Sequence, residues 1–242
     1  MTALLEASGL SKSFRGLRAV AGASFDVPEG QISALIGPNG AGKTTVFNLI
    51  AGVHAPDAGT IHFRGRPIHG LRPDQICAAG IGRTFQLVKP FPALSVLDNV
   101  IVGALLVERS VAGARAAALA TLGKVGLDAR AAQPAATLTL SDRKRLEVAR
   151  ALATRPRLLL LDEVMAGLRP TECDQLVDAF RALHRSEGVT ILLIEHVMRA
   201  VMALAHHIAV LDRGAIIARG APDEVVKNPA VLQCYLGEDT EI

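Results

Sequence analysis

The chain has 242 residues, of which half are hydrophobic and one-fifth are charged. This composition excludes a disordered chain and supplies a sizeable core for one or two domains. Because 26 Lys and Arg face 23 Asp and Glu, and because only 7 Phe and 1 Tyr occur, we expect no nucleic-acid partner.

Neither the cysteines nor the apolar stretches indicate secretion or a membrane span. Cys77, Cys173 and Cys234 stand far apart, and an odd count without metal spacing suits a reducing compartment. The N-terminus lacks the features of a signal peptide, and no apolar stretch reaches the ~18 residues of a membrane helix. We therefore expect a protein that is soluble or held at a membrane by a partner.

The N-terminal part predicts strands, then a glycine loop that opens a helix. Residues 3–36 alternate as strands separated by turns at Arg15-Gly16 and at Pro28-Glu29-Gly30. Gly52 and Pro56 are expected to end the helix after the glycine loop. The segment GTIHFRGRPI then predicts a hairpin, and a further helix is expected from about Pro73 to just before Gly80.

The middle of the chain changes character. Residues 87–152 contain Ala- and Leu-rich segments with short connections, which predict an inserted helical subdomain. The alternation of strand and helix then resumes with the apolar strand RLLLLDE. A helix is expected from Pro170 to a cap at Gly188, with the buried strand VTILLIEH after it and a hairpin around Asp212-Arg213-Gly214.

A phosphate-binding loop is the most specific motif in the chain. Residues 37–44, GPNGAGKT, fit the pattern GxxxxGK[ST] between a predicted strand and a predicted helix. Its glycines let successive backbone N–H groups turn inward toward phosphate oxygens, at the positive end of the helix. Lys43 is expected to reach the β- and γ-phosphates, and the Thr44 hydroxyl to ligate Mg²⁺.

A second acidic motif completes the expected chemistry. Four leucines, 158–161, deliver Asp162 and Glu163 to the carboxyl end of a strand, where open α/β sheets bind ligands. We expect Asp162 to hold Mg²⁺ through water and Glu163 to polarise the attacking water. Positioned charge of this kind accounts for most catalysis of phosphoryl transfer.

The base of the nucleotide has no hydrogen-bonding motif in this sequence. The NKxD motif expected of a G protein is absent, so stacking is the expected mode of recognition. Phe14, which precedes the loop in the first hairpin, either stacks on adenine or belongs to the ordinary core.

These motifs and their order resemble the ATP-binding subunit of ATP-binding cassette (ABC) transporters over residues 4–236. The carriers of the resemblance are the phosphate loop, GIGRTFQ, LTLSDRKRLEVARAL, LLLLDE and VTILLIEH. The strings FPALSVLDNV, LDEVMAGL and VLQCYLG are most similar to the branched-chain amino acid importer branch.

The resemblance implies an α/β fold, a P-loop NTPase (RecA-like) core with an N-terminal antiparallel β subdomain and an inserted α-helical subdomain. The whole chain would be one ABC ATP-binding domain, with its core at 1–86 and 153–242. It also implies ATP and Mg²⁺ as cofactors, with metal ligands Thr44, Gln86 and Asp162 and catalytic roles for Lys43, Gln86, Glu163 and His196. The nucleotide-binding residues implied in this chain are Phe14, Val20, Gly37, Pro38, Asn39, Gly40, Ala41, Gly42, Lys43, Thr44 and Thr45.

The chain departs from the family at the signature segment. Where LSGGQ is usual, it has Leu138 followed by Thr139, Leu140, Ser141 and Asp142, the last four of which would bind nucleotide in trans. Leu140 and Ser141 reduce backbone freedom at positive φ, and Asp142 places a negative charge toward a triphosphate. The basic residues 143–145 are expected either to offset that charge or to form a solvated helix face.

The resemblance implies an energy-coupling ATPase at the cytoplasmic face of the inner membrane. Its partners would be transmembrane permease subunits, a second ATP-binding subunit and, indirectly, a solute-binding protein. The permease would dock on a groove formed by the helical insert and the surface after Gln86. Because the signature of one subunit covers the ATP held by the other, the altered signature predicts two unequal ATP sites in a heterodimer.

Two alternatives stay open at this stage. One is a soluble ABC-type ATPase acting on nucleic acid or ribosomes, although such chains usually fuse two cassettes or carry a long coiled insert. The other is a nucleotide-binding regulatory protein with low turnover, which the altered signature favours.

Overall fold

The computed structural model describes residues 2–86 and 89–236. The chain divides into two compact units, one formed by residues 1–76 and 190–242 and the other by residues 77–189. Residues 87 and 88, which open the predicted helical subdomain, and Gly237, which ends VLQCYLG, lie outside the described residues. The subdomain boundaries at 87 and 152 stay a prediction.

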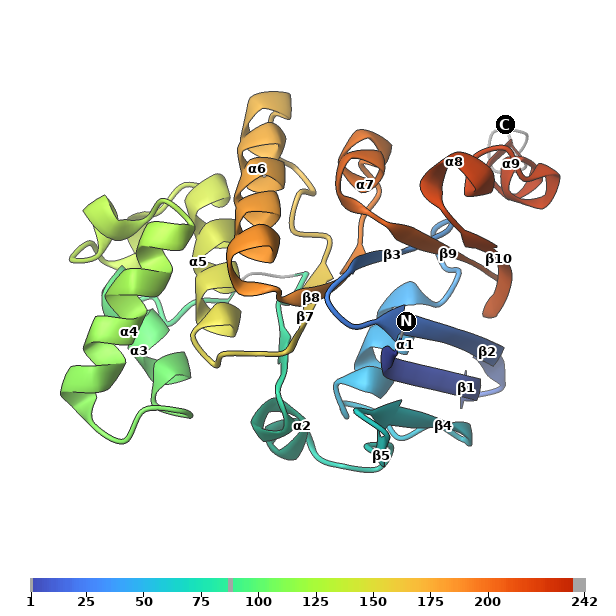
Figure 1. Cartoon of the computed structure of the whole chain (residues 1–242), viewed down its shortest axis with the longest axis horizontal. Coiled ribbons are helices and arrows are strands. Elements are labelled where there is room, and N and C mark those ends of the chain that lie inside the picture. The colour runs from blue at the N-terminus through green and yellow to red at the C-terminus, as the bar shows by residue number, and fades with distance from the viewer. Residues whose placement is uncertain (1, 87–88, 237–242) are drawn as a thin grey trace. The chain divides into compact units, whose positions relative to one another are not determined.

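An antiparallel sheet belongs to the first unit, with the strand order β2-β1-β4-β5 (Figure 1). Strand β1 pairs with β2 and with β4, so that Ala7 lies opposite both Phe25 and Ile61. All three side chains are buried, because alternate residues of each strand face the core. The strands are β1 (Ala3–Phe14), β2 (Leu17–Pro28), β4 (Ala58–Phe63) and β5 (Arg66–Pro67).

The first unit also contains neighbouring parallel strands in the order β9-β3-β8, and β10 pairs antiparallel with β9. Ala34 lies between Ile208 on one side and Leu193 on the other. Strands β3 and β8 are buried at every residue, in agreement with their largely apolar sequences, ISALI and TILLI. The bounds are β3 (Ile32–Ile36), β8 (Thr190–Ile194), β9 (His207–Asp212) and β10 (Ala215–Gly220).

The helices of the first unit follow the ends of these strands. Helix α1 begins at the last residues of the glycine loop and buries Phe47 and Ile50. Helix α2 crosses the sequence boundary between the two units. The helices are α1 (Lys43–Ile50), α2 (Pro73–Ala79), α7 (Met198–Leu204), α8 (Pro222–Val225) and α9 (Pro229–Leu236).

The second unit combines two parallel strands with most of the longer helices. Strands β6 and β7 pair so that Arg83 lies opposite Leu160. Ser95, Ser110 and Thr139 each cap a helix by accepting a hydrogen bond from a backbone N–H three residues on. The elements are β6 (Ile81–Arg83), α3 (Val96–Ala104), α4 (Val111–Lys124), η1 (Asp128–Arg130), η2 (Ala135–Thr137), α5 (Leu140–Leu152), β7 (Leu158–Asp162) and α6 (Pro170–Glu187).

Most of the predicted elements are confirmed. The strands within 3–36, the helix after the glycine loop, the hairpin before α2 and the start of α6 at Pro170 are all present. Gly188 caps α6 in the left-handed conformation, at φ 63°. The sequence analysis missed β6 and α7, because each is short and β6 has a glycine at its centre.

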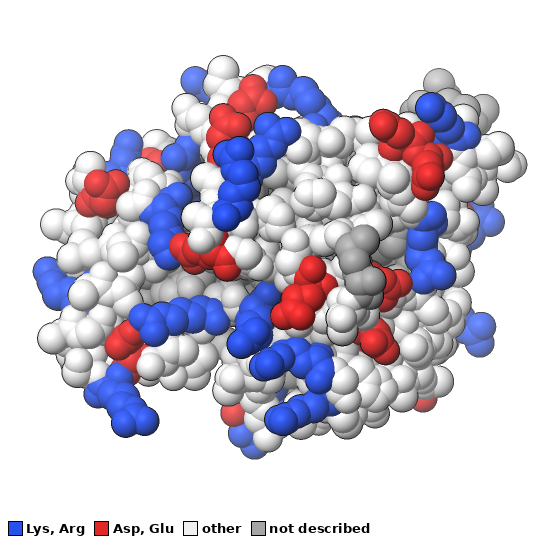
Figure 2. Space-filling view, viewed as in Figure 1, with Lys and Arg blue, Asp and Glu red and all other residues white. Residues whose placement is uncertain are grey.

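Two surface properties bear on what the chain can contact. Within residues 2–86 and 89–236, no helix has both the length and the apolar character needed to cross a membrane. Figure 2 shows basic and acidic side chains interspersed over the visible face, as expected for a net charge of +3.

Candidate functional site

The predicted site residues fall in both units of the chain. In the first unit, the phosphate loop follows β3 and leads into α1. Two of its glycines are required by close backbone approaches. A Cβ on Gly37 would lie 1.9 Å from the carbonyl oxygen of Leu211, and one on Gly42 would lie 2.2 Å from that of Ala19. Both residues also have positive φ, at 148° and 104°, so an L side chain is disfavoured there on two grounds.

The Lys43 ammonium group is buried within the loop that carries it. Its Nζ donates hydrogen bonds to the carbonyl oxygens of Gly37, at 2.6 Å, and Pro38, at 2.7 Å. A buried ammonium group needs such acceptors, and phosphate oxygens are stronger acceptors of the same kind. Thr44 is exposed at the first turn of α1, whereas Thr45 is half-buried. The loop therefore places a cation next to an exposed residue that carries a hydroxyl group.

His196 lies just after strand β8, at the same edge of the sheet as the phosphate loop. Strands β3 and β8 run parallel, so the loop after Ile36 and the segment after Ile194 begin at the same end of the sheet. His196 is exposed there. The structure thus brings the predicted switch histidine and the loop to one edge of the first unit, although their motifs lie far apart in the sequence.

The two residues predicted near adenine have different surroundings. Phe14 is 39% exposed, and its ring meets the His54 ring edge-on with centroids 5.1 Å apart. Lys12 Nζ also lies 5.7 Å from the Phe14 centroid. Val20 is fully buried. Of these two residues, only Phe14 therefore exposes side-chain surface on which a base could stack. Its stacking role stays a prediction.

In the second unit, Asp162 is the last residue of β7 and is almost completely buried. Arg83 Nη2 lies 2.9 Å from its Oδ2, and Thr84 Oγ1 accepts a hydrogen bond from its backbone N–H at 3.0 Å. Burial raises the pKa of Asp162, and the Arg83 guanidinium opposes that rise. Arg83 therefore keeps a buried carboxylate in place.

Glu163 directly follows β7 in a left-handed backbone conformation, at φ 49°. Gln86 Nε2 donates a hydrogen bond to its Oε2 at 2.6 Å, and Lys144 Nζ donates to its backbone carbonyl oxygen at 2.9 Å. The structure thus brings together Gln86 and Glu163, two residues that the sequence analysis singled out from separate motifs 77 positions apart.

The altered signature segment caps helix α5. Thr139 is the N-cap residue, and its Oγ1 accepts the backbone N–H of Asp142 at 3.2 Å. Leu140 and Ser141 lie in the first turn, and neither has positive φ, so the loss of glycine causes no backbone strain there. The four residues therefore form an ordinary helix start.

The charge of Asp142 is offset by a residue that the sequence analysis did not name. Arg130 Nη1 lies 3.0 Å from Asp142 Oδ2. The expectation that residues 143–145 supply this charge, or form a solvated face, is wrong for two of them. Lys144 is buried and binds Glu163, and Arg145 donates to Gln175 at 2.5 Å. Helix packing turns these two side chains away from Asp142.

Sequence reasoning also missed Arg83 and Lys144 as partners of the acidic motif. Arg83 lies in GIGRTFQ, three positions before Gln86, and Lys144 lies in the basic run after Asp142. The available signal was that a buried strand ending in two carboxylates requires nearby cations. This signal indicates that a cation is needed near the two carboxylates, but it does not indicate which Lys or Arg residue supplies it.

Comparison with known proteins places the chain among transporter subunits. The family profile described as "ABC transporter" matches residues 20–166, and the profile "Branched-chain amino acid ATP-binding cassette transporter" matches residues 215–241. The high-affinity branched-chain amino acid transport ATP-binding protein BraF of Pseudomonas aeruginosa is 41% identical, over 97% of this chain and 98% of that protein. LivG of Escherichia coli, with the same description, is 40% identical over the same shares.

More distant similarities extend to another transport process and to solved structures. The lipopolysaccharide export system ATP-binding protein LptB of Acidithiobacillus ferridurans is 34% identical over the full length of both chains. The crystal structure of the ADP conformation of MJ1267, an ATP-binding cassette of an ABC transporter, superposes with a TM-score of 0.88. It is 29% identical and covers 98% of this chain and 100% of its own. The predicted fold class is confirmed.

Proposed function

The chain belongs to the ABC transporter family and is an ATP-binding, ATP-hydrolysing subunit, and on this premise we propose that it drives import of branched-chain amino acids or a related small polar solute. The observation that carries the choice of solute is the near full-length similarity to branched-chain amino acid transport proteins, at 41% and 40% identity. The profile match at residues 215–241 supports the same branch. The identity to the lipopolysaccharide export protein is lower, at 34%.

The proposed residue roles follow the local geometry. Lys43 binds the β- and γ-phosphates, the backbone of residues 37–45 surrounds them, and Phe14 stacks on adenine. Glu163 polarises the attacking water, Gln86 orients Glu163, and His196 contacts the γ-phosphate. The Gln86–Glu163 hydrogen bond of 2.6 Å supports this division of roles, since it fixes the carboxylate in one orientation.

The acidic motif fits a Mg²⁺ ion. Asp162 Oδ1 is buried and has no hydrogen-bond partner among the described residues, whereas Oδ2 binds Arg83. Mg²⁺ prefers oxygen ligands, carboxylates above all, and keeps several waters. We assign Thr44, Gln86 and Asp162 to hold it. When bound, Mg²⁺ supplies positive charge to the phosphate oxygens.

The proposed assembly contains permease subunits in the membrane, a second ATP-binding subunit and a solute-binding protein, with this chain on the cytoplasmic face. Residues 139–142 would cover the nucleotide held by the partner subunit. The Asp142 carboxylate supports two ATP sites of unequal strength in a heterodimer, because the partner's triphosphate would face an acidic side chain. ATP does work by binding the closed dimer more tightly than the open one.

The experiment that tests the catalytic role is Glu163→Gln in the assembled transporter. The variant keeps a side chain of the same size, so we expect Mg·ATP binding to persist while turnover falls by roughly 10²–10⁴-fold. Glu6→Gln, an exposed position in β1, is the matched control. Turnover that is unchanged by Glu163→Gln would remove Glu163 from catalysis.

The solute is tested by ATPase stimulation in vesicles that contain the permease and the solute-binding protein. We expect leucine, isoleucine or valine to stimulate hydrolysis, and charged amino acids to leave it at the basal rate. Stimulation by lipopolysaccharide instead would contradict the proposed import. A wild-type chain that binds ATP but does not hydrolyse it in this complex would favour the regulatory alternative.

A further inference from the structure

The described residues around Gln86, namely 85–86 and 89–91 (the Gln86 segment), contact one helix, α5, on both sides of the glutamine. On one side, the backbone N–H of Phe85 donates to the Glu147 carboxylate. On the other side, the carbonyl oxygen of Lys89 accepts from Arg150 Nη1 at 3.2 Å, and the Arg150 guanidinium lies 5.1 Å from the centroid of the Phe91 ring. Two side chains of a single helix therefore hold both flanks of Gln86.

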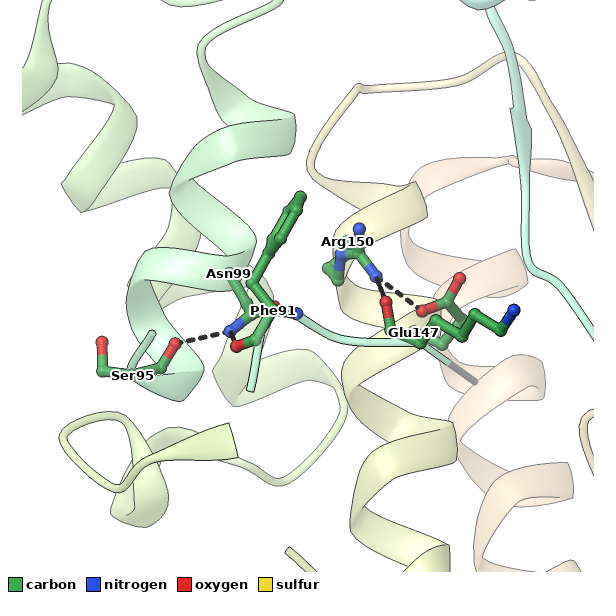
Figure 3. A network of polar contacts seen from close by, with 6 residues as sticks. Phe91, Ser95, Asn99, Glu147 and Arg150 are labelled. Atoms are coloured by element: carbon green, nitrogen blue, oxygen red, sulfur yellow. Dashed lines mark hydrogen bonds and ion pairs between the residues drawn. The ribbon is translucent and has the colours of Figure 1, made fainter. Parts of the chain in front are cut away.

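Glu147 and Arg150 also bind each other. Arg150 Nη1 lies 2.9 Å from Glu147 Oε2, and the side chains of Arg150 and Glu147 are 23% and 6% exposed (Figure 3). A buried carboxylate is costly without partners, so Glu147 is confined to the position where it meets both Arg150 and Phe85. The planar guanidinium of Arg150 contacts the Glu147 carboxylate, the Lys89 carbonyl oxygen and the Phe91 ring at the same time. The ammonium group of a lysine is less suited to these three contacts, because it is neither planar nor forked.

Asn99 gives the segment a fixed end. This buried amide accepts the Phe91 N–H at 2.8 Å through Oδ1 and donates to the carbonyl oxygens of Phe91 and Ser95 through Nδ2, at 3.0 and 2.9 Å (Figure 3). Because the Phe91 backbone is held by α3 in this way, its ring is a firm surface for Arg150. Phe85 and Phe91, which lie on either side of Gln86 in the sequence, are therefore each held by described side chains: Phe85 by Glu147, and Phe91 by Asn99 and Arg150.

The same face of α5 reaches Glu163. Lys144, Glu147 and Arg150 are spaced three residues apart, so they lie along one side of the helix. Lys144 holds the Glu163 carbonyl oxygen at 2.9 Å, while Glu147 and Arg150 hold the Gln86 segment. One helix face thus fixes both partners of the Gln86–Glu163 hydrogen bond.

We infer that Glu147 and Arg150 are positioning residues, which set the Gln86 side chain against Glu163 and so control ATP turnover from within α5. This inference rests on the proposed catalytic role of Glu163. It also connects the Gln86 segment to α5, the helix whose first turn carries residues 140–142. Neither Glu147 nor Arg150 is assigned to touch nucleotide.

The expected effect is a loss of turnover without a loss of nucleotide affinity. Misplacing a reacting group by about 1 Å can cost roughly 10²-fold in rate, so Glu147→Gln and Arg150→Lys should lower kcat by roughly 10–100-fold. The KM for ATP should be unchanged, because the residues of the phosphate loop are untouched. The double variant should lose little more than either single variant, because both substitutions break the same link.

The experiment uses the assembled transporter. It measures kcat and KM for the two single variants and the double variant, with Glu108→Gln and Arg155→Lys as matched controls. Glu108 and Arg155 form another ion pair in the same unit. Hydrogen exchange resolved to single amides gives a second readout. Glu147→Gln should speed exchange at the Phe85 N–H, whereas the Thr84 N–H, which is bonded to the Leu160 carbonyl oxygen at 2.9 Å, should be unaffected.

The outcomes separate this inference from the proposed function. A lower kcat at constant KM, with faster exchange confined to Phe85, supports positioning. Wild-type kcat in both single variants overturns it, and so does faster exchange that extends equally to Thr84, because that pattern reports general loosening. Glu163→Gln is measured in parallel. If it retains turnover, the proposed catalytic role of Glu163 fails, whereas if it alone loses turnover, only the positioning role fails.

Discussion

Arg83 and Asp162 form an almost completely buried ion pair, with Arg83 Nη2 2.9 Å from Asp162 Oδ2 and side-chain exposures of 8% and 1%. The two residues end neighbouring parallel strands, β6 and β7, so strand pairing delivers the guanidinium to the carboxylate. One carboxylate oxygen is occupied by Arg83, and Oδ1 has no partner among the described residues. The pair explains how a chain can keep an acidic residue at the buried end of an apolar strand.

Removing Arg83 should destabilise the fold. Arg83→Ala leaves the Asp162 charge buried and uncompensated, so the free energy of unfolding should fall by about 3–5 kcal/mol in urea titrations. Arg72→Ala is the control, because the Arg72–Asp74 pair is exposed and its loss should leave the free energy of unfolding nearly unchanged. Adding Asp162→Asn to Arg83→Ala should restore part of the loss. Equal stabilities of Arg83→Ala and Arg72→Ala would contradict this account of the pair.

The phosphate loop should tolerate substitution unequally at its glycines. A Cβ on Gly42 meets the Ala19 carbonyl oxygen at 2.2 Å, whereas one on Gly40 has nothing within 4 Å. Both residues have positive φ, so the comparison isolates the steric effect. In titrations with a fluorescent ATP analogue, Gly42→Ala should weaken binding by more than roughly tenfold, about 1.4 kcal/mol, relative to Gly40→Ala. Indistinguishable affinities would show that the loop can shift to accept the methyl group.

Arg130 should protect the partner's nucleotide from Asp142. Arg130→Ala removes the guanidinium 3.0 Å from Asp142 Oδ2 and leaves a net negative charge at the start of α5. We expect ATP-dependent dimer closure to need only roughly two- to fivefold more ATP. This pair is partly exposed, and exposed ion pairs contribute up to roughly 1 kcal/mol, which corresponds to a change of that size. Closure is followed by chromatography at rising ATP concentrations. Asp142→Asn in the same background should return the midpoint to that of the wild type, and failure to do so would assign Arg130 another role.

Glu147 should make stability depend on pH in a defined direction. Burial raises the pKa of Glu147 above its ordinary value of 4.5, and Arg150 only partly opposes that rise. Because the pKa is raised in the folded state, the contribution of this group to stability is full below its ordinary pKa. The contribution is lost as the pH rises through the folded pKa, since the buried carboxyl group must then give up its proton and carry a charge.

The stability of the wild type relative to Glu147→Gln should therefore be greatest in acid and should decline as the pH rises from the ordinary pKa of 4.5 through the raised pKa of the folded state. Urea unfolding of both proteins at a series of pH values measures this difference. Glu108→Gln serves as the control, because Glu108 belongs to the more exposed Glu108–Arg155 ion pair. A difference that grows with pH would show that the partners of Glu147 outweigh its burial.

Local spacing alone determined much of this protein. The glycine pattern of residues 37–44, the four leucines before Asp162 and the proline at 170 each specify a backbone conformation that depends only on near neighbours in sequence. The phosphate loop, the buried strand and the start of α6 could therefore be predicted, and so could the family that they indicate. The functional roles of the individual residues stay predictions.

Only the tertiary structure decided which side chains meet. Arg83 with Asp162, Gln86 with Glu163, and Arg130 with Asp142 are pairs chosen by strand pairing and helix packing between segments distant in sequence. The basic run 143–145 shows why sequence could not make that choice, since three adjacent cations on a helix point in different directions. The sequence shows that buried carboxylates will need cationic partners. Which cation becomes the partner depends on where the folded backbone places each Cβ atom.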